Sequence, residues 1–161
     1  MHSYRKWPGV TETLCACALL ILISVSPVSA QSQNQQIAQI KTVSGQVTIM
    51  RGDGKVPANV GGALFEKDII ETGADGAVGV TFIDNTVMSA GPNSEVALEE
   101  FKFDSSNFKG SMLTDLRKGT VSMVSGDIAK SSPEAMKVKT PTAILGVRGT
   151  RFVIQAAGAG N

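Results

Sequence analysis

The segment AVGVTFIDNTVMSA, residues 77–90, indicates the fold class. Val78, Val80 and Phe82 alternate with small or polar residues, which is the period-two pattern of a half-buried strand. The dipeptide Asp84-Asn85 then ends the run as a tight turn, and the short strand pattern TVMSA follows it. This segment therefore predicts two short strands joined by a turn.

The same pattern continues in both directions along the chain. Alternation at Val47 and Ile49 precedes the turn RGDGK, in which Asp53-Gly54 is a sufficient turn signal without an adhesive role for the RGD tripeptide. No segment has a sustained helical period, and SSPEAM, residues 131–136, predicts one helical turn at most. We expect an all-β single domain of short strands, either a twisted two-layer sandwich or a short β-solenoid.

Sixteen apolar residues are expected inside this fold. They are Val47, Ile49, Leu64, Ile69, Val78, Val80, Phe82, Val96, Leu98, Val121, Met123, Val138, Ile144, Val147, Phe152 and Ile154.

The N-terminus has the order of a secretory signal peptide. A short basic start leads into an apolar run at residues 14–25, and small residues end at Ala30. The run is shorter than the ~20 residues that a membrane span needs, so we expect cleavage, no stable membrane insertion, and a periplasmic or secreted protein. The expected organisation is a signal peptide at 1–30, a disordered polar lead at 31–38, a β domain at 39–155 and a flexible tail at 156–161.

Composition excludes several functions of the mature chain. Both cysteines and the only His, Trp and Tyr lie in the first 30 residues, and the remainder carries 13 Lys/Arg against 13 Asp/Glu. This inventory predicts no cofactor, no metal site, no Ser-His or Cys-His catalysis and no nucleic-acid binding. Four carboxylates around one strand are better explained as solvated edge residues than as an acid/base pair, so we expect no enzyme. They are Glu95, Glu99, Glu100 and Asp104.

The segment PTAILGVRGTRFVI, residues 141–154, breaks a strand pattern with two glycines. Its candidate structural or partner-contact motif consists of Gly146, Arg148, Gly149, Thr150 and Arg151. One interpretation is a loop whose guanidinium contacts an anion or a partner. The favoured interpretation is a β-corner, in which the glycines bend the chain and Arg148 pairs with a carboxylate of the same fold.

The order EKDIIETG, VTFIDNT, GPNSEVALEEF, LRKGTVSMVSG and VKTPTAILGVRGTRF resembles the FecR domain family, over about Ile40 to Ile154. Two turns depart from the family pattern. Asp84-Asn85 stands where the family usually has Asp-Gly, and Lys67-Asp68 stands where it usually has Gly-Asp. Regulatory members also carry a cytoplasmic segment and a membrane helix, which these 161 residues do not contain. The resemblance therefore does not imply transmembrane signalling here.

Export, the resemblance and the missing catalytic residues together predict a non-catalytic interaction module of the bacterial envelope. It would dock to an envelope protein in sensing or assembly, and an unpaired strand edge is the natural docking site. The alternative is a structural or adhesive module associated with the cell wall or a surface glycan. Against that alternative, the mature chain lacks the Trp and Tyr that usually stack on sugars.

Overall fold

Strands dominate the part of the chain that the computed structural model describes, residues 35–132, 134–148 and 151–158. This part forms twelve strands and one short helix, so the all-β prediction is confirmed. The first six strands are β1 (Ala38–Ser44), β2 (Val47–Arg51), β3 (Gly54–Pro57), β4 (Ala63–Leu64), β5 (Ile69–Thr72) and β6 (Ala77–Phe82). The other elements are β7 (Val87–Ala90), β8 (Glu95–Asp104), β9 (Lys109–Val124), α1 (Asp127–Ser131), β10 (Met136–Lys139), β11 (Ile144–Gly146) and β12 (Arg151–Ala156).

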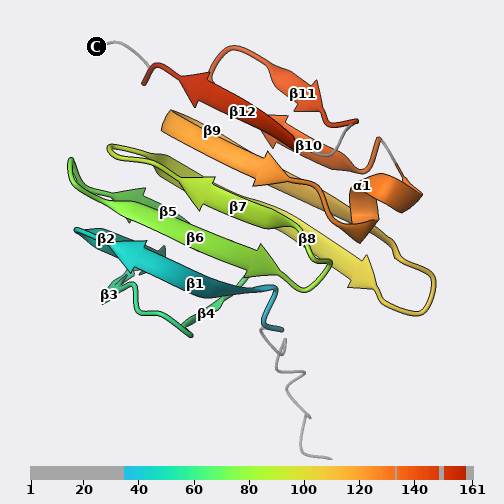
Figure 1. Ribbon diagram of the computed structural model, residues 1–161, viewed down its shortest axis with the longest axis horizontal. Coiled ribbons are helices and arrows are strands. Elements are labelled where there is room, and N and C mark those ends of the chain that lie inside the picture. Colours follow the sequence, from blue (N-terminus) through green and yellow to red (C-terminus); the bar gives the residue numbers. More distant parts are fainter. Residues whose placement is uncertain (1–34, 133, 149–150, 159–161) are drawn as a thin grey trace, which may run out of the picture. The chain divides into compact units, whose positions relative to one another are not determined.

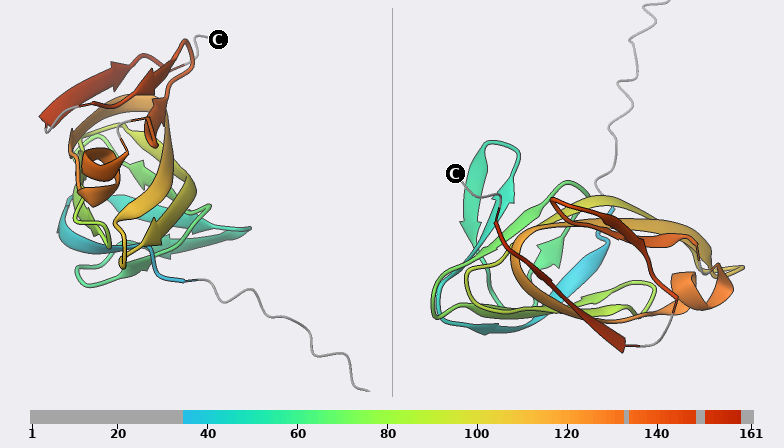
Figure 2. Two further views of the ribbon diagram at one scale, coloured as in Figure 1. Left: turned by 90° about the vertical axis from the view of Figure 1, so that its right-hand side faces the viewer. Right: turned by 90° about the horizontal axis from the view of Figure 1, so that it is seen from above.

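Strand pairing arranges these elements in two layers of one curled sheet (Figures 1 and 2). Layer 1 contains β4, β1, β6, β7, the second half of β9, and β12. Layer 2 contains β3, β2, β5, β8, the first half of β9, β10 and β11. Neighbours run antiparallel, except that β10 lies parallel to β9. Because a solenoid stacks its coils in parallel, the two-layer alternative describes this fold better.

Four long strands, each folded over once, build most of both layers. β1 continues into β2, β5 into β6 and β7 into β8, while β9 passes from one layer to the other along its own length. The crossings lie at residues 45–46, 73–76, 91–94 and 118–120. In Figure 1 the ends of β1, β6, β7 and β9 at these crossings all lie on the left, opposite α1.

Backbone hydrogen bonds tie each crossing to the next. The Gly73 N–H donates to the Gln46 carbonyl at 2.8 Å, and the Asn93 N–H donates to the Gly73 carbonyl at 2.9 Å. The Gly91 N–H donates to the Thr120 carbonyl at 2.9 Å. The chain therefore keeps its peptide groups paired while it turns from one layer to the other.

Glycine is required where neighbouring crossings approach most closely. Gly119 has a φ of +90°, and a Cβ atom there would lie 2.2 Å from the Ser94 hydroxyl oxygen and 2.5 Å from its Cα. Gly45 has a φ of +61°, and its Cβ would lie 2.2 Å from the Asp75 carbonyl oxygen. Both the left-handed backbone and the lack of space exclude a side chain at these positions.

Residues from both layers meet in one apolar core. The rings of Phe82 in layer 1 and Phe101 in layer 2 stack with their centroids 5.5 Å apart. Helix α1 covers the end opposite the crossings, where Ile128 is completely buried. The Asp127 N–H donates to the Asp84 carbonyl at 2.8 Å, which holds the helix against the β6–β7 turn.

Most of the expected core residues are buried, and the exceptions have local causes. The buried ones are Val47, Ile49, Leu64, Val78, Val80, Phe82, Val96, Leu98, Val121, Met123, Val138 and Val147. Phe152 and Ile154 are partly buried. In β5 the inward residue is Ile70, not Ile69. The prediction for Ile144 is wrong, because it lies in the edge strand β11 and is 65% exposed.

The boundaries of two elements differ from the sequence-based expectation. Ile37 and Ala38 are buried, so the ordered chain begins inside the expected polar lead. The helix spans Asp127–Ser131 and ends where the helical turn of SSPEAM was expected to begin. The expected signal peptide, residues 1–30, and residues 31–34 lie outside the described residues.

We expect Gly119→Ala to lower the free energy of unfolding by about 2–3 kcal/mol, because alanine would be strained at this φ and would clash with Ser94. Gly91→Ala is the matched control, since its Cβ would meet nothing nearer than 3.8 Å. Urea unfolding of the two variants measures the difference. Equal stability would contradict the tight-crossing interpretation.

The Thr114 hydroxyl is buried and has no hydrogen-bond partner in the part of the chain that is described. We expect Thr114→Val to stabilise the protein by about 1 kcal/mol, because the valine has the same shape and no polar atom to desolvate. Thr72→Val is the contrasting variant, since the Thr72 hydroxyl donates to the Gly91 carbonyl and accepts from the Ser94 N–H. Thr72→Val should lower the free energy of unfolding. The melting temperatures of the two variants, compared with that of the unchanged protein, provide the measurement.

Candidate functional site

The C-terminal strand β12 has one free edge. Among the described strands, β3, β4, β11 and β12 pair with a single neighbour each. β3 is four residues long and contains Lys55 and Pro57, β4 has two residues, and β11 has three. Short length, lysine and proline are features that protect a sheet edge from unwanted pairing. β12 has six residues and neither lysine nor proline, and its one charged residue is Arg151 at its first position, so the rest of β12 is the least protected of these edges.

The side chains of β12 alternate as they do in a strand at a sheet edge. Val153 points outward and is 64% exposed, whereas Phe152 and Ile154 are partly buried against the core. In layer 2, Ile144 of β11 is also 65% exposed. A strand added beside β12 would therefore find both unpaired peptide groups and apolar side chains.

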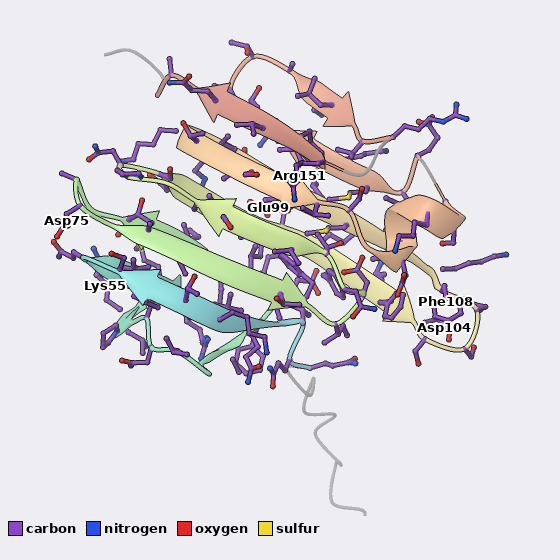
Figure 3. All side chains as sticks on the ribbon, viewed as in Figure 1. Lys55, Asp75, Glu99, Asp104, Phe108 and Arg151 are labelled. Carbon is purple, nitrogen blue, oxygen red and sulfur yellow. The ribbon has the colours of Figure 1, made fainter. Side chains whose placement is uncertain are left out.

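The GVRGT motif connects the two C-terminal edges. Gly146 ends β11 and Arg151 begins β12, with Arg148 exposed between them (Figure 3 labels Arg151). Gly149 and Thr150 lie outside the described residues. No carboxylate of residues 35–132, 134–148 and 151–158 forms an ion pair with Arg148, so the expected intramolecular pair is not found there.

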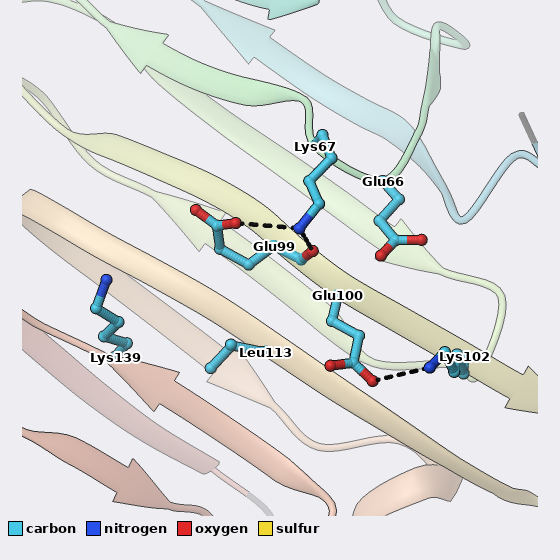
Figure 4. A pocket seen from close by; sticks show the side chains of 7 residues that line it. All are labelled: Glu66, Lys67, Glu99, Glu100, Lys102, Leu113 and Lys139. Atoms are coloured by element: carbon cyan, nitrogen blue, oxygen red, sulfur yellow. Dashed lines mark hydrogen bonds and ion pairs between the residues drawn. The ribbon is translucent and has the colours of Figure 1, made fainter.

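The outer face of layer 2 forms an open, charged groove (Figure 4). Its lining residues are Glu66, Lys67, Glu99, Glu100, Lys102, Leu113 and Lys139. Lys67 Nζ lies 3.3 Å from Glu99 Oε2, and Lys102 Nζ lies 3.5 Å from Glu100 Oε1. Charges of opposite sign thus compensate each other along the groove.

The carboxylates considered for acid/base chemistry all have partners in the fold. Arg117 lies 3.0 Å from Glu95, and the Ser111 hydroxyl donates to Glu100 at 2.6 Å. That hydrogen bond, followed by the charge of Lys102, lowers the pKa of Glu100. A general acid at neutral pH needs a raised pKa instead, so the electrostatics of Glu100 do not suit that role.

Asp104 lies apart from this groove, in the hairpin between β8 and β9 (Figure 3). The Ser106 hydroxyl donates to it at 2.6 Å and is the main cause of its lowered pKa. The described residues contain no cluster of His, Cys, Asp or Glu suited to a metal ion. Among the same residues, no helix has the length and hydropathy of a membrane span.

The arginine of the RGD tripeptide holds a loop in place. Arg51 forms a bidentate pair of hydrogen bonds with the Asp68 carboxylate: Nε donates to Oδ1 at 2.8 Å and Nη2 donates to Oδ2 at 2.7 Å. Asp68 is only 1% exposed. The Phe65 N–H donates to the same carboxylate at 2.9 Å, and the guanidinium lies 4.4 Å from the centre of the Phe65 ring. The hydrogen bond to Asp68 raises the pKa of Arg51. Arg51 is therefore occupied by internal contacts. The turn itself consists of Gly52 and Asp53, and Gly54 already pairs with Arg51 as the first residue of β3, so the expected Asp53-Gly54 turn lies one residue earlier.

The sequence from Asp68 to the C-terminus matches one family, described as "FecR protein", over residues 68–161. The chain belongs to the FecR family. Comparison with curated proteins and with solved structures gives no match. The family match begins at the buried carboxylate that holds Arg51 and covers every strand from β5 to β12.

The two departures of this FecR-family chain from the usual turns fall at left-handed backbone positions. Lys67 has a φ of +72° and Asn85 a φ of +65°, so both take a shape that glycine would adopt without strain. Asn85 also donates from its amide to Asp127 at 2.8 Å, and this bond is the main cause of the lowered pKa of Asp127. Neighbouring Asp84 is fully buried and accepts from both the N–H and the hydroxyl of Thr86.

We expect Lys67→Gly to be more stable than Lys67→Ala by about 1 kcal/mol. Both variants lose the contact between Lys67 and Glu99, so the difference isolates the cost of a left-handed φ for a residue with a Cβ. Urea unfolding of the two variants side by side provides the measurement. If their stabilities were equal, the turn would not hold Lys67 in that conformation.

Proposed function

We propose that this FecR-family chain is a non-catalytic, exported interaction module of the bacterial envelope. It docks to a protein partner by adding an extended segment of that partner to the free edge of β12. The observation that carries the proposal is the unprotected edge of β12 beside the 64% exposed Val153. In such complexes the main-chain hydrogen bonds give affinity and alternate side chains give specificity.

The position of β12 supports this role. It pairs along all six residues with the second half of β9, the strand that belongs to both layers. A docking edge held on a rigid strand keeps its peptide groups in place before the partner arrives, which lowers the entropy cost of binding. The paired carboxylates of layer 2 support the non-catalytic part of the proposal, because catalysis would need a free acid or base.

Export to the periplasm or outside the cell is supported by the sequence pattern of residues 1–30. The cell-wall alternative has weaker support. Phe108 in the β8–β9 hairpin is 51% exposed (Figure 3), and it is the one exposed aromatic ring among the described residues. A protein surface that stacks on sugars usually presents more than one exposed aromatic ring.

In the test, a photoreactive amino acid replaces Val153 in the full chain, and cross-linking is carried out in the bacterium that expresses this chain. Val60 is the matched control position, since it is 67% exposed but lies in the loop between β3 and β4. We expect a discrete cross-linked protein from position 153 and none from position 60. No product from position 153, or the same products from both, would contradict docking at β12. Sedimentation with cell-wall material in that case would favour the alternative.

A further inference from the structure

Charge is divided unevenly between the C-terminal strands and the rest of the fold. Residues 35–135 contain nine Lys/Arg and thirteen Asp/Glu, a formal charge of −4. Residues 136–158 contain four Lys/Arg and no Asp/Glu, a formal charge of +4. The protein is almost neutral overall, but its C-terminal segment, residues 136–158, is basic and the preceding residues 35–135 are acidic.

The four cations of residues 136–158 differ in whether they form an ion pair. Lys139 Nζ lies 3.0 Å from the Asp115 carboxylate, so its charge is compensated within the fold. Lys137, Arg148 and Arg151 are exposed, and none of them forms an ion pair with the described carboxylates.

Glu134 is the acidic residue nearest to this segment in the sequence. Its Oε2 atom lies 3.8 Å from the position that a Cβ of Gly146 would take. It pairs with none of the three exposed cations in the described part of the chain, so it reduces their field without neutralising any one of them.

Arg151 is the first residue of β12, and Arg148 precedes it by three residues in the chain. A strand that adds to the whole free edge of β12 therefore ends or begins beside Arg151, with Arg148 three residues earlier in the chain. Arginine forks bind carboxylates with two parallel hydrogen bonds, and a charged rim selects the partner and speeds the encounter. Exposed Val153 would face an apolar side chain further along the added strand.

We propose that the β12 edge selects an extended protein segment that carries carboxylates beside Arg148 and Arg151 and apolar residues along Val153. This inference rests on the proposed docking function and adds the chemistry of the partner. An anionic lipid surface fits less well, because residues 35–135 have a net charge of −4 and would be repelled by it. A nucleic acid fits less well for the same reason.

The test measures peptide binding to protein purified after expression of the full chain. Arg151 and Val153 share one face of β12, so the peptide must place a carboxylate and an apolar side chain on the same face. One fluorescent peptide of about eight residues, within the usual range for a strand, therefore carries glutamates in one half and valines in the other, and its matched partner has lysine in place of each glutamate. We expect the glutamate peptide to bind about tenfold more tightly at about 50 mM NaCl, and this preference to shrink at about 300 mM. Fluorescence anisotropy gives both affinities.

The variant Arg148→Gln/Arg151→Gln should lower the affinity for the glutamate peptide about tenfold and abolish the preference. Lys41→Gln/Lys109→Gln is the matched control, because it removes the same number of exposed cations from β1 and from the start of β9. It should leave both affinities unchanged. An equal loss in both double variants would overturn the proposal, because it would indicate net charge alone.

The remaining outcomes separate this inference from the docking function. Equal binding of the two peptides, or of neither, would overturn the acidic partner, while a cross-link from Val153 would still support docking. Loss of that cross-link would overturn both. Binding to vesicles of phosphatidylglycerol that requires Arg148 and Arg151 would assign the edge to a membrane instead. Self-association in sedimentation that requires the same arginines would assign it to a second copy of the chain.

Discussion

Close approach of four chain crossings is the constraint on which both layers depend. At residues 45–46, 73–76, 91–94 and 118–120 the backbone turns from one layer to the other, and backbone hydrogen bonds join each crossing to its neighbour. Peptide groups that turn a corner would otherwise lose their partners and be costly to bury. Gly45 and Gly119 permit this approach because a side chain at either position would overlap the next backbone. β9 changes layer at this corner, and β12 pairs with the part of β9 that follows it.

The same architecture leaves sheet edges of different kinds. β3 and β4 at the N-terminal side are short, and β3 contains lysine and proline, so they resist pairing with other chains. β12 lies on the other side of β9, without these protections and with Arg151 at its start. Meanwhile the charges on the outer face of layer 2 compensate each other, as for Lys67 with Glu99. At the start of β12, by contrast, Arg151 forms no ion pair with the described carboxylates.

Alternation made many of the buried residues predictable, since Val78, Val80 and Phe82 must share one face of any strand. The alternation pattern failed where the neighbouring strands determine which residues are buried. Ile144 has the sequence context of a core strand, yet β11 has a neighbour on one side only and leaves it exposed. Ile69 and Ile70 are adjacent and equally apolar, so only the pairing of β5 with β2 and β8 determines which one faces inward. The free edge of β12 was equally invisible, because β12 contains neither the lysine nor the proline that often marks an edge strand.

By itself, the sequence determined the all-β class, most turn positions, membership of the FecR family and the absence of His and Cys after residue 30. These properties depend on local alternation, on turn chemistry and on which side chains are present. Only the tertiary structure decided that Arg51 is held by Asp68, that Arg148 has no carboxylate partner among the described residues, and that β12 is a free edge. Those facts concern contacts between segments far apart in the chain, and their geometry arises only when the four folded strands pair.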